Sequence, residues 1–111
     1  MSNNITYYFY QVFQGVKFLM GLKSRLRAER LPIKLKEIRG KLGLSQNEML
    51  QQIGYEENFD RSTISHYESG EREPPLPILL AYARAANIYV DELIDDNLDL
   101  PKKLPKSGKR F

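Results

Sequence analysis

The stretch from Asp60 to Gly70 restricts the fold of this chain more than any other. It begins with a helix-starting residue, because the Asp60 carboxylate can accept a free backbone N–H of the first turn. It ends with Gly70, which takes up a left-handed conformation at low cost. Between them only Ile64 and Tyr67 are large and apolar, and they share one helical face. Isolated helices below about 12 residues are marginal in water, so a helix over residues 61–69 must be held by its neighbours.

One such neighbour is predicted immediately upstream. Ser45 and Glu48 have the spacing of a capping box, in which each side chain satisfies a backbone N–H of the other residue. Gly54 is expected to end this helix, whose buried edge consists of Met49, Leu50 and Ile53. Two helices joined by a glycine-containing connection are typical of a helix-turn-helix.

Hydrophobic spacing predicts three further helices, over residues 33–42, 76–86 and 90–94. Gly40 lies inside the first of them, where glycine is unfavourable, and close packing at this position would explain it. The outer face of that helix is expected to carry Lys34, Lys36, Arg39 and Lys41. The last helix is expected to turn Leu93 and Ile94 inward.

These segments resemble the lambda repressor-like helix-turn-helix family, to which Cro and the phage repressors belong. The matching residues are Leu-Gly-Leu-Ser-Gln (42–46), Arg-Ser-Thr-Ile-Ser-His-Tyr-Glu-Ser-Gly (61–70), Arg72, Pro74 and Ile-Tyr-Val-Asp-Glu-Leu-Ile (88–94). The resemblance spans about residues 35 to 94. It implies an all-α fold, a compact bundle of about five short helices in which the second and third form the DNA-reading pair.

The resemblance also implies roles for single side chains. Arg61, Ser62 and Ser65 match the base-facing positions, although Arg61 would alternatively pair with Glu57. The residues expected to contact the DNA backbone or to brace the reading helix are Gln46, His66, Ser69 and Arg72. Two features depart from the family. The turn over residues 55–60 is longer than usual, and Leu50 replaces a small alanine where the two helices meet.

Charge is distributed unevenly along the chain. Residues 1–43 hold nine Lys or Arg against two acidic residues, residues 44–100 hold three against twelve, and residues 101–111 hold five bases and no acid. The net charge of +3 therefore combines an acidic centre with two basic flanks. Neutralising phosphates supplies most non-specific DNA affinity. We expect either that Arg61, Arg72 and the first helix focus positive potential, or that the flanks attract DNA.

The sequence divides into three parts. Residues 33–96 form the DNA-binding domain, residues 1–32 an aromatic and basic extension, and residues 97–111 a basic flexible tail, unstructured from about Pro101. The basic run over residues 23–30 is either a solvated helix face or an arm along DNA phosphates. The same two alternatives apply to the tail.

An apolar stripe occupies the first twenty residues and follows helical spacing, with Ile5, Phe9, Val12, Val16 and Leu19 on one face. The aromatic residues 5–10 would also suit a strand. Polar residues interrupt the stripe before it reaches the roughly 20 residues of a membrane span. The stripe has three possible roles. It is a helix that covers the domain or a partner subunit, or a segment upstream of a natural translation start at Met20. The third role is attachment to a membrane surface, which is disfavoured because the basic residues lie mostly after the stripe.

The available side chains argue against an enzyme. His66 is the sole histidine, cysteine is absent, and no glycine-rich phosphate loop is present, so we expect neither a metal nor a cofactor. A cysteine-free chain suits the reducing cytoplasm. The carboxylates of the acidic centre come in adjacent pairs, which diverge on a helix or loop and serve solubility.

The sequence therefore predicts a cytoplasmic transcriptional regulator of double-stranded DNA, a repressor that reads the major groove as a homodimer. Its dimer interface would be either the stripe or the last helix, with Tyr89, Leu93 and Leu98. Two alternatives use the same fold: an antitoxin that binds its own operator and a toxin protein, and a protein-interaction module that uses the acidic centre.

Overall fold

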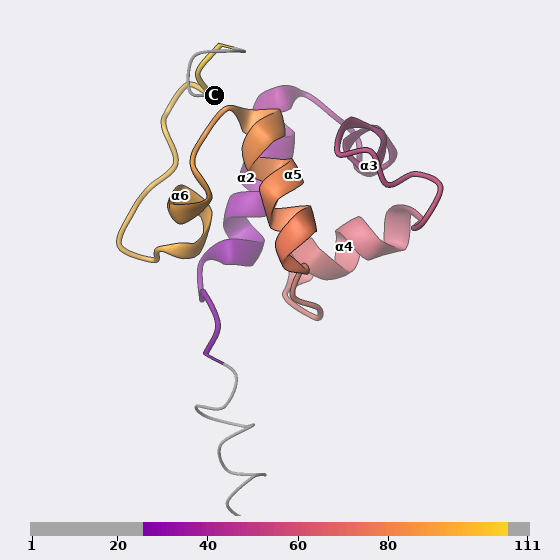
Figure 1. The fold of residues 1–111 in the computed structure, drawn as a ribbon, viewed down its shortest axis with the longest axis horizontal. Coiled ribbons are helices and arrows are strands. Elements are labelled where there is room, and N and C mark those ends of the chain that lie inside the picture. Colours follow the sequence, from indigo (N-terminus) through magenta and orange to yellow (C-terminus); the bar gives the residue numbers. More distant parts are fainter. Residues whose placement is uncertain (1–25, 107–111) are drawn as a thin grey trace, which may run out of the picture.

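The computed structural model describes residues 26–106, and the apolar stripe and the last five residues lie outside this range. Its five helices are α2 (Leu31–Leu42), α3 (Gln46–Gln52), α4 (Arg61–Ser69), α5 (Leu76–Ala86) and α6 (Val90–Ile94). In Figure 1, α2 and α5 lie at the centre, α3 and α4 on one side, and α6 on the other. No strand occurs between residues 26 and 106. The predicted all-α bundle of five short helices is thus confirmed.

Most of the predicted helix ends are present, but α2 begins at Leu31 instead of residue 33, and the C-cap of α3 is Ile53 instead of Gly54. The backbone N–H of Glu48 donates to Ser45 Oγ at 3.1 Å, and the Glu48 carboxylate accepts from the Ser45 N–H at 2.8 Å. Asp60 accepts the N–H of Ser62 at 2.9 Å at the start of α4. Gly70, with φ of +83°, ends that helix in the left-handed region, where a side chain would be strained. Local chemistry therefore sets the limits of α3 and α4.

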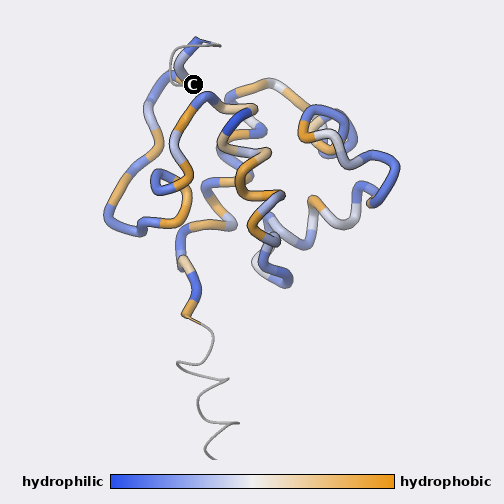
Figure 2. Tube along the Cα trace, viewed as in Figure 1, coloured by the Kyte–Doolittle hydropathy of each residue, from blue (hydrophilic) through white to orange (hydrophobic). Residues whose placement is uncertain are grey.

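The core gathers one face of every helix. Leu35 and Ile38 of α2, Met49 of α3, Ile64 of α4 and Tyr82 of α5 are all fully buried. Figure 2 shows hydrophobic residues along α5, whereas the loop before α4 and the turn after it are hydrophilic. The central position of α5 follows from this composition, because burial of apolar surface is the main favourable term in folding.

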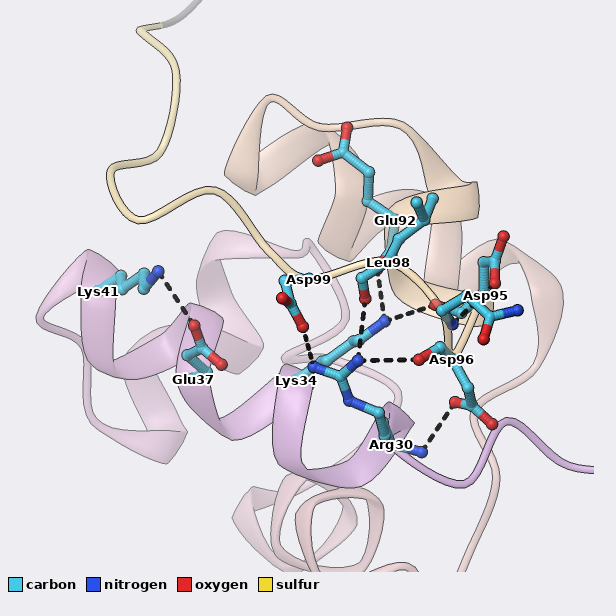
Figure 3. Close-up of polar contacts among 10 residues, drawn as sticks. Arg30, Lys34, Glu37, Lys41, Glu92, Asp95, Asp96, Leu98 and Asp99 are labelled. Carbon is cyan, nitrogen blue, oxygen red and sulfur yellow. Dashed lines mark hydrogen bonds and ion pairs between the residues drawn. The ribbon is translucent and has the colours of Figure 1, made fainter.

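Lys34 contradicts the prediction that it lies on the outer face of its helix, because it is only 1% exposed. Its Nζ donates to the backbone oxygens of Glu92 at 2.9 Å and Asp95 at 2.8 Å, at the end of α6 (Figure 3). Burial lowers the pKa of Lys34. Its position between Leu31 and Ile38 is on the apolar face by helical spacing. The prediction of an exposed Lys34 rested on the residue type alone, because lysine is usually found at the surface.

The chain after α6 folds back on the helices. Leu100 is 7% exposed and belongs to the core, and Leu104 packs against it. Lys41 Nζ donates to the Pro101 carbonyl oxygen at 2.5 Å, and the Asn87 side chain donates to that of Pro105 at 3.2 Å. The expected loss of structure from about Pro101 is therefore corrected: the chain contacts the domain as far as Pro105. Prolines prevent regular structure here, but they do not prevent packing.

Gly40 also differs from the expectation of close packing. It is exposed within α2, and a Cβ added there meets nothing within 4 Å. We expect Gly40→Ala to stabilise the protein by about 0.5–1 kcal/mol, because alanine loses less backbone entropy in a helix.

Urea unfolding of both proteins would measure this difference. Gly43→Ala is the matched control, since its surroundings are equally open but its φ is +71°, so it should destabilise by roughly 1 kcal/mol. Equal effects of the two substitutions would contradict the conformational explanation.

Candidate nucleic-acid interface

Helix α4 has one buried and one exposed face. Ile64 is fully buried, and Tyr67 and Thr63 are 4% and 6% exposed. The side chains predicted to read bases, Arg61, Ser62 and Ser65, are all exposed. They recur along one side of the helix, at i, i+1 and i+4. The helix thus presents a short polar stripe to the outside while its other side is anchored in the core.

The predicted base-facing residues differ in whether their side chains already have a partner within the protein. The Ser62 hydroxyl donates to the Asp60 carboxylate, and this bond is the main reason why the pKa of Asp60 lies below its usual range. Within residues 26–106, the side chains of Arg61 and Arg72 form no hydrogen bond or ion pair, so the alternative pairing of Arg61 with Glu57 is absent. Two exposed guanidinium groups therefore flank α4, near its start and just after its end.

An ion pair joins α2 to α4. Arg39 Nε lies 2.6 Å from Glu68 Oε2, and Arg39 Nη2 donates to Glu68 Oε1 at 3.0 Å. The third nitrogen of Arg39 donates to the Leu44 carbonyl oxygen at 3.0 Å, before α3 begins. The Glu68 hydrogen bond raises the pKa of Arg39, so the guanidinium stays charged. Bidentate pairs of this kind fix orientation as well as adding energy, and this one fixes the angle of α4.

Gln46 adds to the same cluster. Its side-chain Nε2 donates to Glu68 Oε1 at 3.3 Å, which links the start of α3 to the last turn of α4. The prediction gave Gln46 two roles, bracing and phosphate contact. Its geometry is compatible with the first, and the second stays a prediction.

The C-terminal end of α4 is held by short-range contacts. His66 Nδ1 lies 2.8 Å from Glu71 Oε2, and the Ser69 hydroxyl donates to the His66 carbonyl oxygen at 3.1 Å. Arg72 donates its backbone N–H to that same carbonyl oxygen at 3.2 Å. The predicted backbone-contacting residues His66, Ser69 and Arg72 thus lie together in one turn. Glu71 lies among them, and sequence reasoning did not foresee its contacts.

The lengthened turn closes on itself before α4 begins. The Tyr55 carbonyl oxygen accepts the backbone N–H groups of Asn58 and Phe59, both at 3.0 Å. The rings of Tyr55 and Phe59 pack with centroids 6.0 Å apart. The extra residues therefore form a compact loop beside α3 and α4.

A comparison with known families decides the classification. A helix-turn-helix family model, of the Cro and lambda repressor type, matches residues 35–93, which is more than half of the chain. The chain belongs to this helix-turn-helix family. Its members are DNA-binding regulators. No curated protein matches the chain. Among residues 26–106, no helix is long and apolar enough to cross a membrane.

In this helix-turn-helix protein many of the cations outside α4 pair with carboxylates. Arg27 Nε lies 3.5 Å from Glu73, and Arg30 Nη2 lies 2.5 Å from Asp99. The two arginines in the described part of the basic run 23–30 therefore form ion pairs within the domain. As Arg39 is also paired, the positive groups that the structure leaves available around α4 are Arg61 and Arg72. The expectation that α2 also focuses positive potential is not supported, because Lys34 is buried and Arg39 and Lys41 are paired with carboxylates.

Sequence reasoning missed Arg39 and Glu68 as a pair. Arg39 was expected on the outer face of its helix, and Glu68 was not singled out, although its side chain is only 5% exposed. A weak signal existed, because Glu68 stands four residues after the buried Ile64 and so borders the apolar face of α4. Nothing in the sequence indicates that the two residues, 29 positions apart, are partners.

Proposed function

We propose that this protein is a sequence-specific transcriptional repressor that inserts α4 into the DNA major groove. The observation that supports this best is the state of α4, whose inner face is locked by Ile64, Tyr67 and the Arg39–Glu68 pair while its outer face carries an unpaired arginine. An α-helix fits the major groove, and arginine can bond a guanine edge through two N–H groups. Occupying an operator is enough for repression, and a small domain can do so.

Selection of bound sequences from a random duplex pool tests this proposal. We expect a short preferred motif, with an affinity that falls steeply as salt rises, because neutralised phosphates release counterions. Enrichment of no motif, or a salt-independent affinity, would contradict DNA reading and favour a protein-interaction module.

We further propose that two copies bind one operator. A single short helix covers only a few base pairs, so useful specificity needs two half-sites about 34 Å apart. Leu93 is fully buried, so it is removed from the predicted interface, whereas Tyr89 and Leu98 are 49% and 39% exposed. The prediction that Ile94 of α6 turns inward is wrong, because Ile94 is 47% exposed. A monomeric mass by light scattering, both free and on a palindromic duplex, would contradict the dimer.

We also propose that the basic tail attracts DNA without reading its sequence, and this proposal can be tested without removing core residues. The described lysines after Leu100 are all exposed: Lys102, Lys103 and Lys106. Changing all three to Gln should weaken binding to every duplex by a similar factor, because binding to phosphates carries no sequence information. The slope of log affinity against log salt should flatten by up to about 0.9 for each phosphate that is no longer neutralised.

The readout is a salt titration on the preferred duplex and on a scrambled one, with thermal unfolding as a control for folding. Unchanged affinity and slope would mean that these lysines serve solubility alone. A changed base preference would contradict a purely electrostatic role and place the tail in a groove.

A further inference from the structure

A groove of about 620 Å³ opens where the described chain begins, and its lining is mostly apolar apart from Arg27, Glu73 and Asp96. Its floor is formed by buried Leu31 and Leu79, from the first turns of α2 and α5. Its sides carry leucine and isoleucine side chains that face solvent: Leu26 is 86% exposed, Leu76 78% and Ile94 47%. Contiguous exposed apolar surface of this kind marks an interaction site more often than isolated exposed residues do.

The chain that enters the domain is fastened to both sides of this groove. On one side, the Asp96 carboxylate accepts the backbone N–H groups of Glu29 at 2.9 Å and Arg30 at 3.0 Å, the second of which Figure 3 shows. On the other side, Arg27 lies 3.5 Å from the Glu73 carboxylate and donates to the Gly70 carbonyl oxygen at 3.1 Å. These bonds hold Leu26 at the rim, so the 25 preceding residues begin at the groove.

We propose that the groove is occupied by the N-terminal apolar stripe of the same chain. The stripe carries one apolar side chain at every third or fourth position, Ile5, Phe9, Val12, Val16 and Leu19. This is the pattern of an amphipathic helix that lays its apolar face in a hydrophobic groove. A helix over residues 5–19 would be about 22 Å long.

The connection between stripe and groove has a suitable length. Six residues, 20–25, separate Leu19 from Leu26, and an extended chain of six residues spans at most about 20 Å. Gly21 within this connection permits a reversal of direction. A short tether holds its ligand at an effective concentration in the millimolar range. The chain's own stripe should therefore occupy the groove in preference to the stripe of a second copy.

The absence of cysteine from the sequence permits a direct test in the full chain. Leu76→Cys would be combined in turn with Phe9→Cys, Val12→Cys and Val16→Cys, and oxidised under mild conditions. Because a disulfide requires Cα atoms within about 7 Å, we expect at least one pair to close within a single chain. Gln14→Cys with Leu76→Cys is the matched control for the polar face, and Val12→Cys with Lys36→Cys is the control for an exposed position that does not line the groove.

The outcomes of cross-linking are distinct. Rapid intramolecular closure of a stripe position, with slow closure of both controls, supports the proposal. Disulfides between two chains would overturn it in favour of a second copy as the occupant. Equal rates for the stripe and both controls would show that the stripe does not dock. None of these results depends on DNA binding.

A thermal double-mutant cycle in the full chain provides an independent measurement. Leu76→Ser and Phe9→Ser should each lower the unfolding midpoint by at least about 4–8 °C, which is the shift that a loss of roughly 1 kcal/mol causes in a domain of this size. Together they should lower it little further, because both disrupt the same interface. If Leu76 remained exposed to solvent, Leu76→Ser would leave the midpoint almost unchanged, and the proposal would be wrong.

Discussion

Replacing Lys34 with Ala is expected to destabilise the domain by about 2–3 kcal/mol. The ammonium group donates to two carbonyl oxygens at the end of α6, at 2.9 and 2.8 Å. Hydrogen bonds to charged groups contribute roughly 1.5–3 kcal/mol, and the substitution would remove both of these bonds together with a buried side chain. Urea unfolding followed by circular dichroism would measure the change in the free energy of unfolding.

Two variants make this test specific. Lys36→Ala, two residues further along the same helix and exposed, should change stability by no more than about 0.5 kcal/mol. Lys34→Met keeps most of the apolar stem but removes the ammonium group with its charge and its two hydrogen bonds, so it separates packing from the polar contribution. Equal stabilities of Lys34→Ala and Lys36→Ala would show that the buried ammonium contributes nothing.

The pH dependence of Lys34 has a definite sign. Burial lowers its pKa in the folded protein from the ordinary 10.5. Between the lowered value and 10.5, the unfolded chain therefore binds more protons than the folded one, so stability rises with pH in that interval. The stability of the natural protein relative to Lys34→Met should increase as pH approaches 10.5 from below. A decrease over this interval would contradict the lowered pKa of Lys34.

Replacing Arg61 with Ala should reduce affinity for the preferred duplex by about 1–3 kcal/mol, or roughly 5- to 150-fold, and relax the preference at one base pair. The side chain is exposed and unpaired within the described residues, so its removal should leave folding unchanged. Competition binding with every single-base variant of the preferred site would measure both effects.

Arg84 offers a matched control for Arg61. It is also an exposed arginine, but it lies near the end of α5, away from the polar stripe of α4. Arg84→Ala should leave base preference unaltered. If Arg61→Ala weakened binding equally for all sequences, Arg61 would bind a phosphate and the base-reading role would be wrong.

The sequence by itself determined the local features of this protein. The Ser45–Glu48 capping box, the Asp60 cap and the Gly70 stop involve residues within a few positions of each other, so their chemistry is visible without a fold. The helical spacing of Ile64 and Tyr67 likewise identified the buried face of α4. Together with the family resemblance, these signals were enough to predict five helices and the helix that faces outward.

Only the tertiary structure decided where the charged and irregular segments lie. Lys34 meets carbonyl groups of residues 92 and 95, and Arg39 meets Glu68, 29 positions away. The chain after α6, rich in proline and lysine, packs through Leu100 because the bundle leaves a site for it. A polar side chain can be buried wherever a partner compensates for the hydration that it gives up. That partner is brought near by folding and cannot be read from neighbouring residues.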